Sequence, residues 1–133
     1  MVLVLDTSFI IGLDNERDVH HNNAKKIWEE IRKGEYGNYI ISDYIFDELM
    51  AVTTRKVSKE RAIKLGQQIL KSVPIMNIDA HMFHETWKLF LESNSNLSFT
   101  DCTNVVILKM LQSKKIATFD KAFKEVKGIE TLP

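Results

Sequence analysis

The sequence predicts an α/β protein, a three-layer α/β/α sandwich with a mostly parallel central sheet of four or five strands. Short apolar runs alternate along the chain with longer segments in which apolar residues recur at helical spacing. The first run, Val2–Leu5, is apolar throughout, which is typical of a parallel strand buried on both faces. A sheet covered by helices on both sides follows from these two observations.

Composition agrees with an ordinary globular protein, because 44% of the residues are hydrophobic and 27% are charged. A chain of 133 residues predicts one domain over residues 1–133. No apolar run approaches the ~20 residues that span a bilayer, and the first run lacks the basic lead of a signal peptide. The single cysteine, Cys102, fits a reducing compartment, so we expect a cytoplasmic protein without a membrane segment.

The first half is predicted to begin with a strand and to contain one more. Gly34 and Gly37 end a helix, Ser42 and Asp43 are both good N-caps, and Ser58 opens a further helix. The predicted order is strand 2–5, helix 7–13, helix 19–33, strand 39–41, helix 44–55 and helix 59–71.

The second half follows Pro74, which stops the preceding helix. Asp79 caps a helix that is expected to carry Met82, Phe83, Trp87 and Phe90 inward. The predicted order is strand 75–78, helix 80–91, a deeply buried helix 102–111, strand 115–119, a short helix through Phe123 and Val126, and an edge strand 129–132.

Four acidic residues stand just past predicted strands or at the start of the helices that follow them. Asp6 and Asp120 each end a strand, Glu48 lies one to two turns into a helix, and Asp101 opens the buried helix. The carboxyl ends of parallel strands meet at one edge of a sheet, where ligands bind in this class of fold. We therefore expect the four carboxylates to converge at that edge.

Converging carboxylates need either protons or a cation. Two unit charges ~4 Å apart repel by about 4 kcal/mol at an effective dielectric of 20. Ligation by aspartate and glutamate suits Mg²⁺ or Mn²⁺, and such ions activate water for attack on a phosphodiester. The predicted chemistry is metal-dependent hydrolysis of a nucleic-acid backbone.

Each acid also has a purely structural interpretation. Ser98 and Asp101 are spaced as an N-cap with its N3 acid, and Asp120 has the position of a cap for the helix that follows. Asp47 competes with Glu48, because helix phase does not decide between them. Asp6 has the fewest alternatives.

The chain resembles a known family at four places. Residues 5–11 (LDTSFII), 46–49 (FDEL), 98–102 (SFTDC) and 117–120 (ATFD) are similar to the four acidic motifs of PIN domains, and most similar to the small VapC-type toxins. The resemblance covers nearly the whole chain in order and spacing, whereas residues 53–93 match nothing specific. It implies a PIN-like fold and a Mg²⁺- or Mn²⁺-dependent endoribonuclease that acts on single-stranded or structured RNA.

The resemblance also implies roles and partners. Asp6, Glu48, Asp101 and Asp120 would be the metal-binding and catalytic acids, and Thr7 and Thr118 hydroxyls near the site. Asn104, one turn after Asp101, is expected to add a supporting contact. The family's members are usually homodimers and are often held inactive by a small antitoxin. The dimer contact is expected on the helices around residues 44–72.

Charge is uneven although the formal net charge is zero. Residues 1–52 carry ten acidic and five basic side chains, and residues 53–72 carry one acidic and six basic. Within the basic segment Arg55, Lys56 and Lys59 are candidates for contact with nucleic-acid phosphates, and a solvated helix face is the alternative.

A second function is a catalytically silent PIN-like module for binding or assembly, which need not take up Mn²⁺. Two other sites have weaker support. His81 and His84 share a helix face without a third ligand at a fitting spacing, and Cys102 has no histidine partner that would make it a nucleophile.

Overall fold

The structure, a computed structural model, describes residues 2–133. The strands are β1 (Val2–Leu5), β2 (Asn38–Ser42), β3 (Ile75–Met76), β4 (Lys115–Ala117) and β5 (Glu130–Leu132). The helices are α1 (Thr7–Asp14), α2 (His21–Arg32), α3 (Asp43–Lys56), α4 (Lys59–Ser72), α5 (Ala80–Glu92), α6 (Phe99–Met110) and the 3₁₀ helix η1 (Lys121–Glu125). The predicted alternation of strands and helices is confirmed.

The strands form one sheet in the order β3-β2-β1-β4-β5, and every neighbouring pair is parallel. The first strand of the chain is the central strand, with Val4 opposite Ile40 on one side and Ile116 on the other. The predicted edge strand at the C-terminus is confirmed as β5. Because all strands run the same way, every strand ends at the same edge of the sheet.

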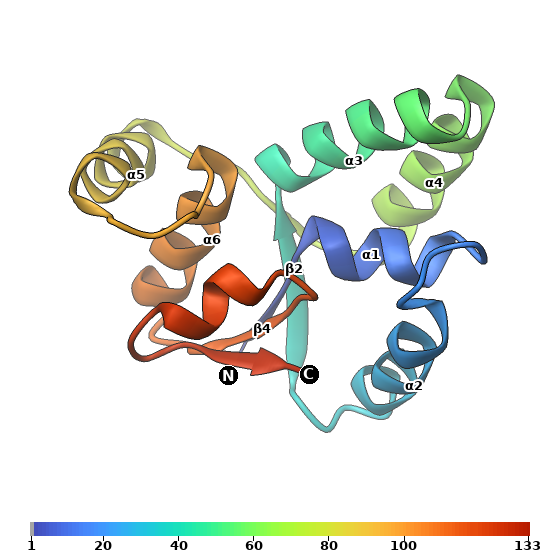
Figure 1. Ribbon diagram of the computed structural model, residues 1–133, viewed down its shortest axis with the longest axis horizontal. Helices are drawn as coiled ribbons and strands as arrows, with labels where there is room; N and C mark the ends of the chain where they lie inside the picture. The colour runs from blue at the N-terminus through green and yellow to red at the C-terminus, as the bar shows by residue number, and fades with distance from the viewer. Residues whose placement is uncertain (1) are drawn as a thin grey trace.

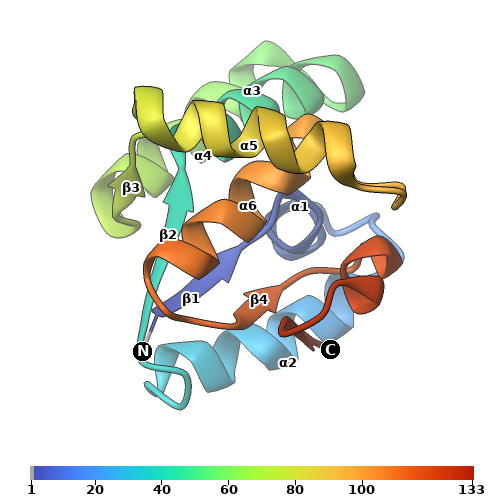
Figure 2. The same ribbon diagram turned by 90° about the vertical axis from the view of Figure 1, so that its left-hand side faces the viewer.

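Helices cover both faces of this sheet (Figure 1). Alternate residues of β1 point to opposite faces, so Leu3 and Leu5 pack against α1, α2 and α4, whereas Val4 packs against α6. Helix α6 lies next to the sheet and α5 lies outside it (Figure 2). The predicted three-layer sandwich is confirmed, with one apolar core on each face.

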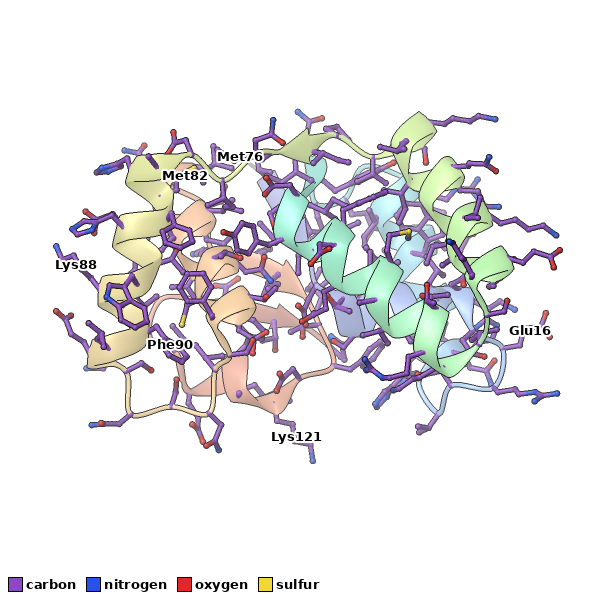
Figure 3. All side chains as sticks on the ribbon, turned by 90° about the horizontal axis from the view of Figure 1, so that it is seen from above. Glu16, Met76, Met82, Lys88, Phe90 and Lys121 are labelled. Carbon is purple, nitrogen blue, oxygen red and sulfur yellow. The ribbon has the colours of Figure 1, made fainter. Side chains whose placement is uncertain are left out.

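Helix α3 begins directly where β2 ends. The Oγ of Ser42 accepts the N–H of Ile45 (3.0 Å), which makes Ser42 the N-cap. Asp43 Oδ1 accepts the N–H of Ile78 (3.1 Å), and this bond holds the segment after β3 against the start of α3. Helix α3 thus lies at the carboxyl edge of the sheet, between α4 and α6 (Figure 3).

The prediction for the aromatic residues of α5 is wrong. Phe83, Trp87 and Phe90 are 48%, 46% and 39% exposed, and only Met82 points into the core. The two sets form neighbouring stripes of α5 at the same helical spacing, since Met82 and Thr86 are the buried pair and Phe83 and Trp87 follow them by one residue. Spacing alone does not indicate which stripe contacts the core.

Several predicted boundaries also differ. The strand predicted over residues 75–78 ends at Met76, because the N–H of Ile78 bonds to the side chain of Asp43 rather than to β2. Helix α2 begins at His21, and Val19, predicted at its start, is 89% exposed. The short helix after Asp120 is a 3₁₀ helix. Within residues 2–133 no helix combines the length and apolarity that crossing a membrane requires.

Candidate active site

Asp6 stands at the carboxyl end of the central strand and is 3% exposed. It occupies the N-cap position of α1 without capping it through its side chain. Its carboxylate instead accepts hydrogen bonds from Thr118 Oγ1 (2.7 Å), Ser8 Oγ (3.0 Å) and Asn104 Nδ2 (3.3 Å). Three hydrogen bonds therefore fix a buried carboxylate that does not cap the N-terminus of α1. Thr118 and Asn104 lie beside Asp6, as predicted.

Asp101 lies in the first turn of α6 and is 8% exposed. Its Oδ2 accepts the N–H of Ser98 (2.9 Å), and Ser98 Oγ accepts the N–H of Asp101 (3.1 Å). The capping box that the sequence predicted is confirmed. The box uses one carboxylate oxygen and fixes the side chain at the end of α6 that meets the site.

Asp120 and Glu48 are both half-buried. Asp120 Oδ1 accepts the N–H of Ala122 (2.9 Å) and so caps η1, while its own N–H donates to Thr118 Oγ1 (3.0 Å). On α3, Asp47 is exposed and Glu48 is turned toward the molecule. The burial of the two side chains thus distinguishes Glu48 from Asp47, which the helical spacing in the sequence does not.

The four acids influence one another electrostatically. Burial raises the pKa of Asp6 to about 6, the charge of Asp101 adds to the rise, and the bonds from Thr118 and Ser8 oppose it. Burial also raises the pKa of Asp101, with further contributions from the charges of Asp120 and Glu48. Asp101 is therefore coupled to each of the other three acids, as convergence at one sheet edge requires.

The oxygen donors of the site suit a hard divalent cation, but the side chains are not arranged around a common metal position. Within residues 2–133, no three Asp, Glu, His or Cys side chains lie close enough together to hold a metal ion as they stand. Asp101 and Asp120 are turned toward the N–H groups of Ser98 and Ala122. The donors are all oxygen atoms, and the buried Oδ1 of Asn104 has no hydrogen-bond partner in the described chain. Ligation of one ion by three acids would need these side chains to rotate.

Ser8 is the residue of the site that sequence reasoning missed. Its Oγ contacts Asp6 Oδ2 (3.0 Å) and Thr118 Oγ1 (3.1 Å) and accepts the N–H of Phe119 (2.9 Å). The hydroxyl of Thr7, expected near the site, is buried without a hydrogen-bond partner among residues 2–133. The available signal was proximity in the sequence, because Ser8 is a hydroxyl residue only two places after Asp6.

Replacing Ser8 with alanine is expected to lower the free energy of unfolding by about 1–3 kcal/mol, because the half-buried N–H of Phe119 loses its acceptor and Asp6 loses a donor. Urea unfolding followed by circular dichroism measures the change. Ser72→Ala is the control, since its exposed hydroxyl bonds only to the carbonyl of Gln68, and we expect a change below about 0.5 kcal/mol. Equal effects of the two changes would contradict the role given to Ser8.

The basic segment lies at the far end of α3 and the start of α4. Arg55, Lys56 and Lys59 are exposed, and none has a carboxylate within 4.0 Å in the described chain. Arg55 follows Glu48 by seven residues, which places the two on the same face of α3 about 10 Å apart along the axis. A phosphate chain that passes the acids and follows α3 would reach Arg55.

Two weaker candidates receive no support. His81 and His84 are exposed and belong to no group of three possible ligands within residues 2–133. Cys102 is fully buried, and burial raises the pKa of its thiol, which disfavours the reactive thiolate.

Known proteins resemble this chain along nearly its whole length. The family model described as PIN domain matches residues 3–129. The 23S rRNA-specific endonuclease VapC20 of Mycobacterium tuberculosis is 22% identical over 134 residues and is covered over 99% of either chain. A VapC ribonuclease of Archaeoglobus fulgidus is 25% identical over 127 residues, which are 92% of this chain and 80% of the relative.

Solved structures share the fold. The crystal structure of VapC20, described as a sarcin-ricin loop cleaving toxin, superposes with a TM-score of 0.88 at 20% identity and covers 98% of this chain and 99% of its own. A toxin-antitoxin complex from Klebsiella pneumoniae gives a TM-score of 0.71 at 19% identity and covers 98% of both chains. At these identities the structures establish the shared architecture alone.

Proposed function

The chain belongs to the PIN domain family, and from this membership we propose that it is an endoribonuclease that needs Mg²⁺ or Mn²⁺. The observation that carries the proposal is the burial of two carboxylates, Asp6 and Asp101, at the carboxyl edge of the parallel sheet. The raised pKa values of these two groups agree with it. Buried carboxylates with raised pKa values destabilise a protein unless a cation or protons neutralise them. Relatives named as ribonucleases support the same reaction.

The four acids have distinct places in the proposed site. Asp6 and Asp101 are buried and would hold the cation, and the half-buried Glu48 and Asp120 would complete its ligands. A bound divalent cation supplies activation of water and stabilises charge on phosphate oxygens. Thr118, Ser8 and Asn104 orient Asp6 through the hydrogen bonds described above.

The proposed substrate is RNA, single-stranded or exposed in a structured loop. The names of two relatives support this substrate. One is a 23S rRNA-specific endonuclease, and the other is named a ribonuclease. Arg55, Lys56 and Lys59 would contact phosphates away from the cleaved bond, because they are exposed and have no carboxylate partner among residues 2–133. Arg55 also lies on the same face of α3 as Glu48.

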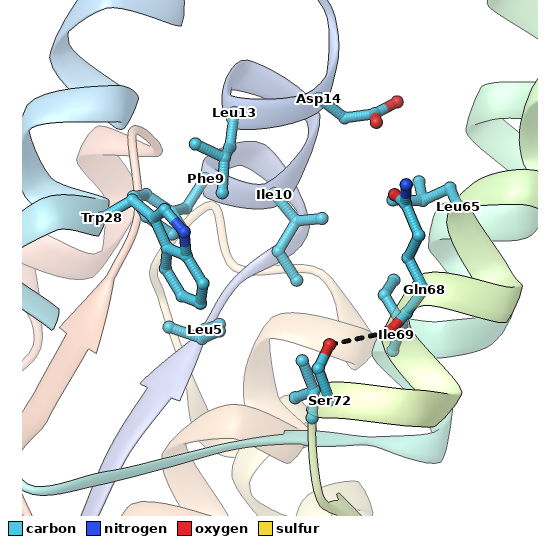
Figure 4. A pocket seen from close by; sticks show the side chains of 11 residues that line it. Leu5, Phe9, Ile10, Leu13, Asp14, Trp28, Leu65, Gln68, Ile69 and Ser72 are labelled. Carbon is cyan, nitrogen blue, oxygen red and sulfur yellow. Dashed lines mark hydrogen bonds between the residues drawn. The ribbon is translucent and has the colours of Figure 1, made fainter. Parts of the chain in front are cut away.

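A small antitoxin is the proposed protein partner, and residues 1–133 would act as the toxin, a single nuclease domain in the cytoplasm. Toxin-antitoxin complexes among the fold's relatives support the partner. A cleft of about 360 Å³ lies between α1, α2 and α4 (Figure 4). Leu13, Trp28 and Leu65 give it a mainly apolar lining, which suits the apolar face of a partner helix.

A homodimer is also proposed, and the structure alters where its contact is best sought. In residues 44–72 the large exposed apolar side chains are Val57, Ile63 and Leu70, none of which is aromatic. The exposed aromatic rings of α5 form a contiguous group, in which Phe83 and Phe90 both contact Phe99 (5.4 and 5.9 Å between ring centroids). Clustered aromatic side chains are typical of protein interfaces, so α5 fits the contact better.

The test is cleavage of a labelled RNA by the purified protein. With Mn²⁺ we expect endonucleolytic fragments, with EDTA in excess no cleavage above background, and after renewed addition of Mn²⁺ full recovery. A matched DNA oligonucleotide should stay intact. Cleavage that persists in EDTA would refute the metal requirement, and intact RNA under all conditions would refute the nuclease.

The second candidate function is a silent PIN-like module that binds or assembles without catalysis. Isothermal titration with Mn²⁺ distinguishes the two, because the nuclease must take up the ion through Asp6 and Asp101. Heat of binding that disappears in Asp101→Asn favours the nuclease. Absence of binding in the parent protein favours the module.

A further inference from the structure

A second pocket opens directly beside the acidic site. This cavity of about 180 Å³, named the His20 pocket below, adjoins the acids through two shared residues, Thr118 and Asp120. Besides these two, it is lined by His20, Asn23, Phe119, Lys121, Lys124 and Pro133. A group bound in it would lie next to whatever the acids hold.

The imidazole of His20 is held in a fixed position in this pocket. Its ring stacks on Phe119 at 4.2 Å between centroids and 5° between planes. The N–H of Phe119 donates to Ser8 Oγ, which in turn donates to Asp6 (3.0 Å). Through Phe119, the imidazole of His20 is therefore connected to the acidic site. The hydrogen bonds that His20 makes within residues 2–133 use its backbone, which leaves both ring nitrogens available to a ligand.

The pocket also carries positive charge that no carboxylate takes up. Lys121 and Lys124 are exposed, and neither lies within 4.0 Å of an acidic side chain in the described chain, whereas Lys64, Lys88 and Lys114 each pair with a glutamate. Lys121 extends away from the fold (Figure 3) and follows Asp120 directly in the chain. The two lysines add positive charge next to a site that is otherwise negative, so they favour an anionic ligand.

Size limits what this ligand is. A cavity of 180 Å³ holds roughly six water molecules at ~30 Å³ each, and it is smaller than the ~300 Å³ at which pockets for drug-sized molecules begin. A phosphate with part of its ribose fits this volume, and a whole nucleotide does not. The donors on its walls, two ammonium groups, an imidazole and an amide, match phosphate and hydroxyl oxygens.

We propose that the His20 pocket binds the RNA backbone phosphate next to the cleaved bond. Lys121 and Lys124 neutralise this phosphate, and His20 and Asn23 bond to its oxygens or to the adjoining 2′-hydroxyl. The inference rests on the proposed ribonuclease function, and it assigns His20 as a positioning residue that fixes the strand over the acids. A flanking phosphate held here would orient the neighbouring bond for attack.

The experiment measures RNA affinity at several salt concentrations. Fluorescence anisotropy with a labelled single-stranded RNA is read in an Asp101→Asn background, so that the RNA stays intact. Lys121→Ala/Lys124→Ala is expected to weaken binding about tenfold at low salt. It should also reduce the slope of log K against log salt by about 0.7, because the two lysines neutralise one phosphate and each neutralised phosphate contributes ~0.7. The control is Lys33→Ala/Lys109→Ala, two exposed lysines without a carboxylate partner among residues 2–133 at the opposite edge of the sheet.

The control pair should leave both affinity and slope unchanged. An unchanged slope in Lys121→Ala/Lys124→Ala, with or without weaker binding, overturns the proposal, because the two lysines then neutralise no phosphate. If the parent cleaves RNA while this variant keeps its affinity, only the His20 pocket fails. If the parent neither binds nor cleaves RNA in Mn²⁺, the ribonuclease function fails as well.

His20 is tested with a matched pair of changes. His20→Phe keeps a ring that can stack on Phe119 but lacks the nitrogens, and His20→Ala removes both. We expect both variants to raise KM for RNA by a similar factor, about tenfold, with normal thermal unfolding in His20→Phe. A parental KM in His20→Phe would overturn the hydrogen-bonding role of the imidazole.

Discussion

Replacing Asp101 with asparagine is expected to reduce RNA cleavage more than about 100-fold, because even residues that only support a metal ligand cost about 10–100-fold in activity or metal affinity. Asp101 is the acid coupled to all three others. Its loss would remove a proposed ligand of the cation and the charge that adds to the effect of burial in raising the pKa of Asp6. The protein should stay folded, since asparagine Oδ1 accepts the N–H of Ser98 as the carboxylate did. Initial rates with Mn²⁺ in excess give the measurement.

The matched control for this change is Asp47→Asn. It makes the same chemical change on α3 next to Glu48, but Asp47 is exposed and takes no part in the coupling. We expect cleavage within about twofold of the parent, since exposed substitutions seldom alter a protein by more than ~0.5 kcal/mol. If Asp101→Asn cleaves as fast as Asp47→Asn, the acids are not the catalytic site.

The convergence of the acids could be predicted because it follows from topology. An unbroken apolar run stops at Asp6, which places it at the end of β1. The strand predicted over residues 115–119 ends at Ala117 in the structure, so Asp120 lies three residues past β4 and caps η1. A parallel sheet then brings strand ends together, whatever the details of packing. The capping pair Ser98–Asp101 is equally local, since it lies within four consecutive residues.

The supporting contacts could not be predicted, because their partners are distant in the chain. Ser8 bonds to Thr118 and Phe119 across about 110 positions, and no local pattern encodes that distance. The choice between Asp47 and Glu48 depends on how α3 lies over the sheet edge, which the segment itself does not contain. The similarity to the PIN motifs favours Glu48, and the burial of Glu48 relative to Asp47 agrees with that choice.

The aromatic residues of α5 show a different limit. Hydrophobic spacing predicts that a helix has an apolar face, and α5 has two such stripes side by side. The stripe that contacts the core depends on how α5 packs against α6. Phe83 and Phe90 contact Phe99 of α6 at the surface of the molecule and not in its interior. Tyr44, at the start of α3, extends this exposed group toward the acidic site. An exposed aromatic surface beside a polar site is a feature of tertiary packing alone.

Without metal, the protein is expected to lose stability as the pH rises, and Asp6 is the main cause. The ordinary pKa of an aspartate is 3.8, and that of Asp6 in the folded protein is about 6, so the folded state holds the proton more tightly. The contribution of Asp6 is therefore most favourable below about pH 4 and is lost as the pH rises through about 6. The difference between the two pKa values corresponds to about 3 kcal/mol, nearly all of it lost by about pH 7.5.

Asp6→Asn isolates this effect, because other titrating groups are the same in parent and variant. Relative to the parent, the free energy of unfolding of Asp6→Asn should increase by about 2 kcal/mol between about pH 4.5 and about pH 7.5, as measured by urea unfolding in EDTA. Mn²⁺ at the higher pH should stabilise the parent and leave Asp6→Asn nearly unchanged, since the ion binds the folded state through Asp6. A stability difference that does not vary with pH would mean that Asp6 ionises as easily in the folded protein as in water. The carboxylates would then need no cation, and the physical basis for a metal at this sheet edge would be lost.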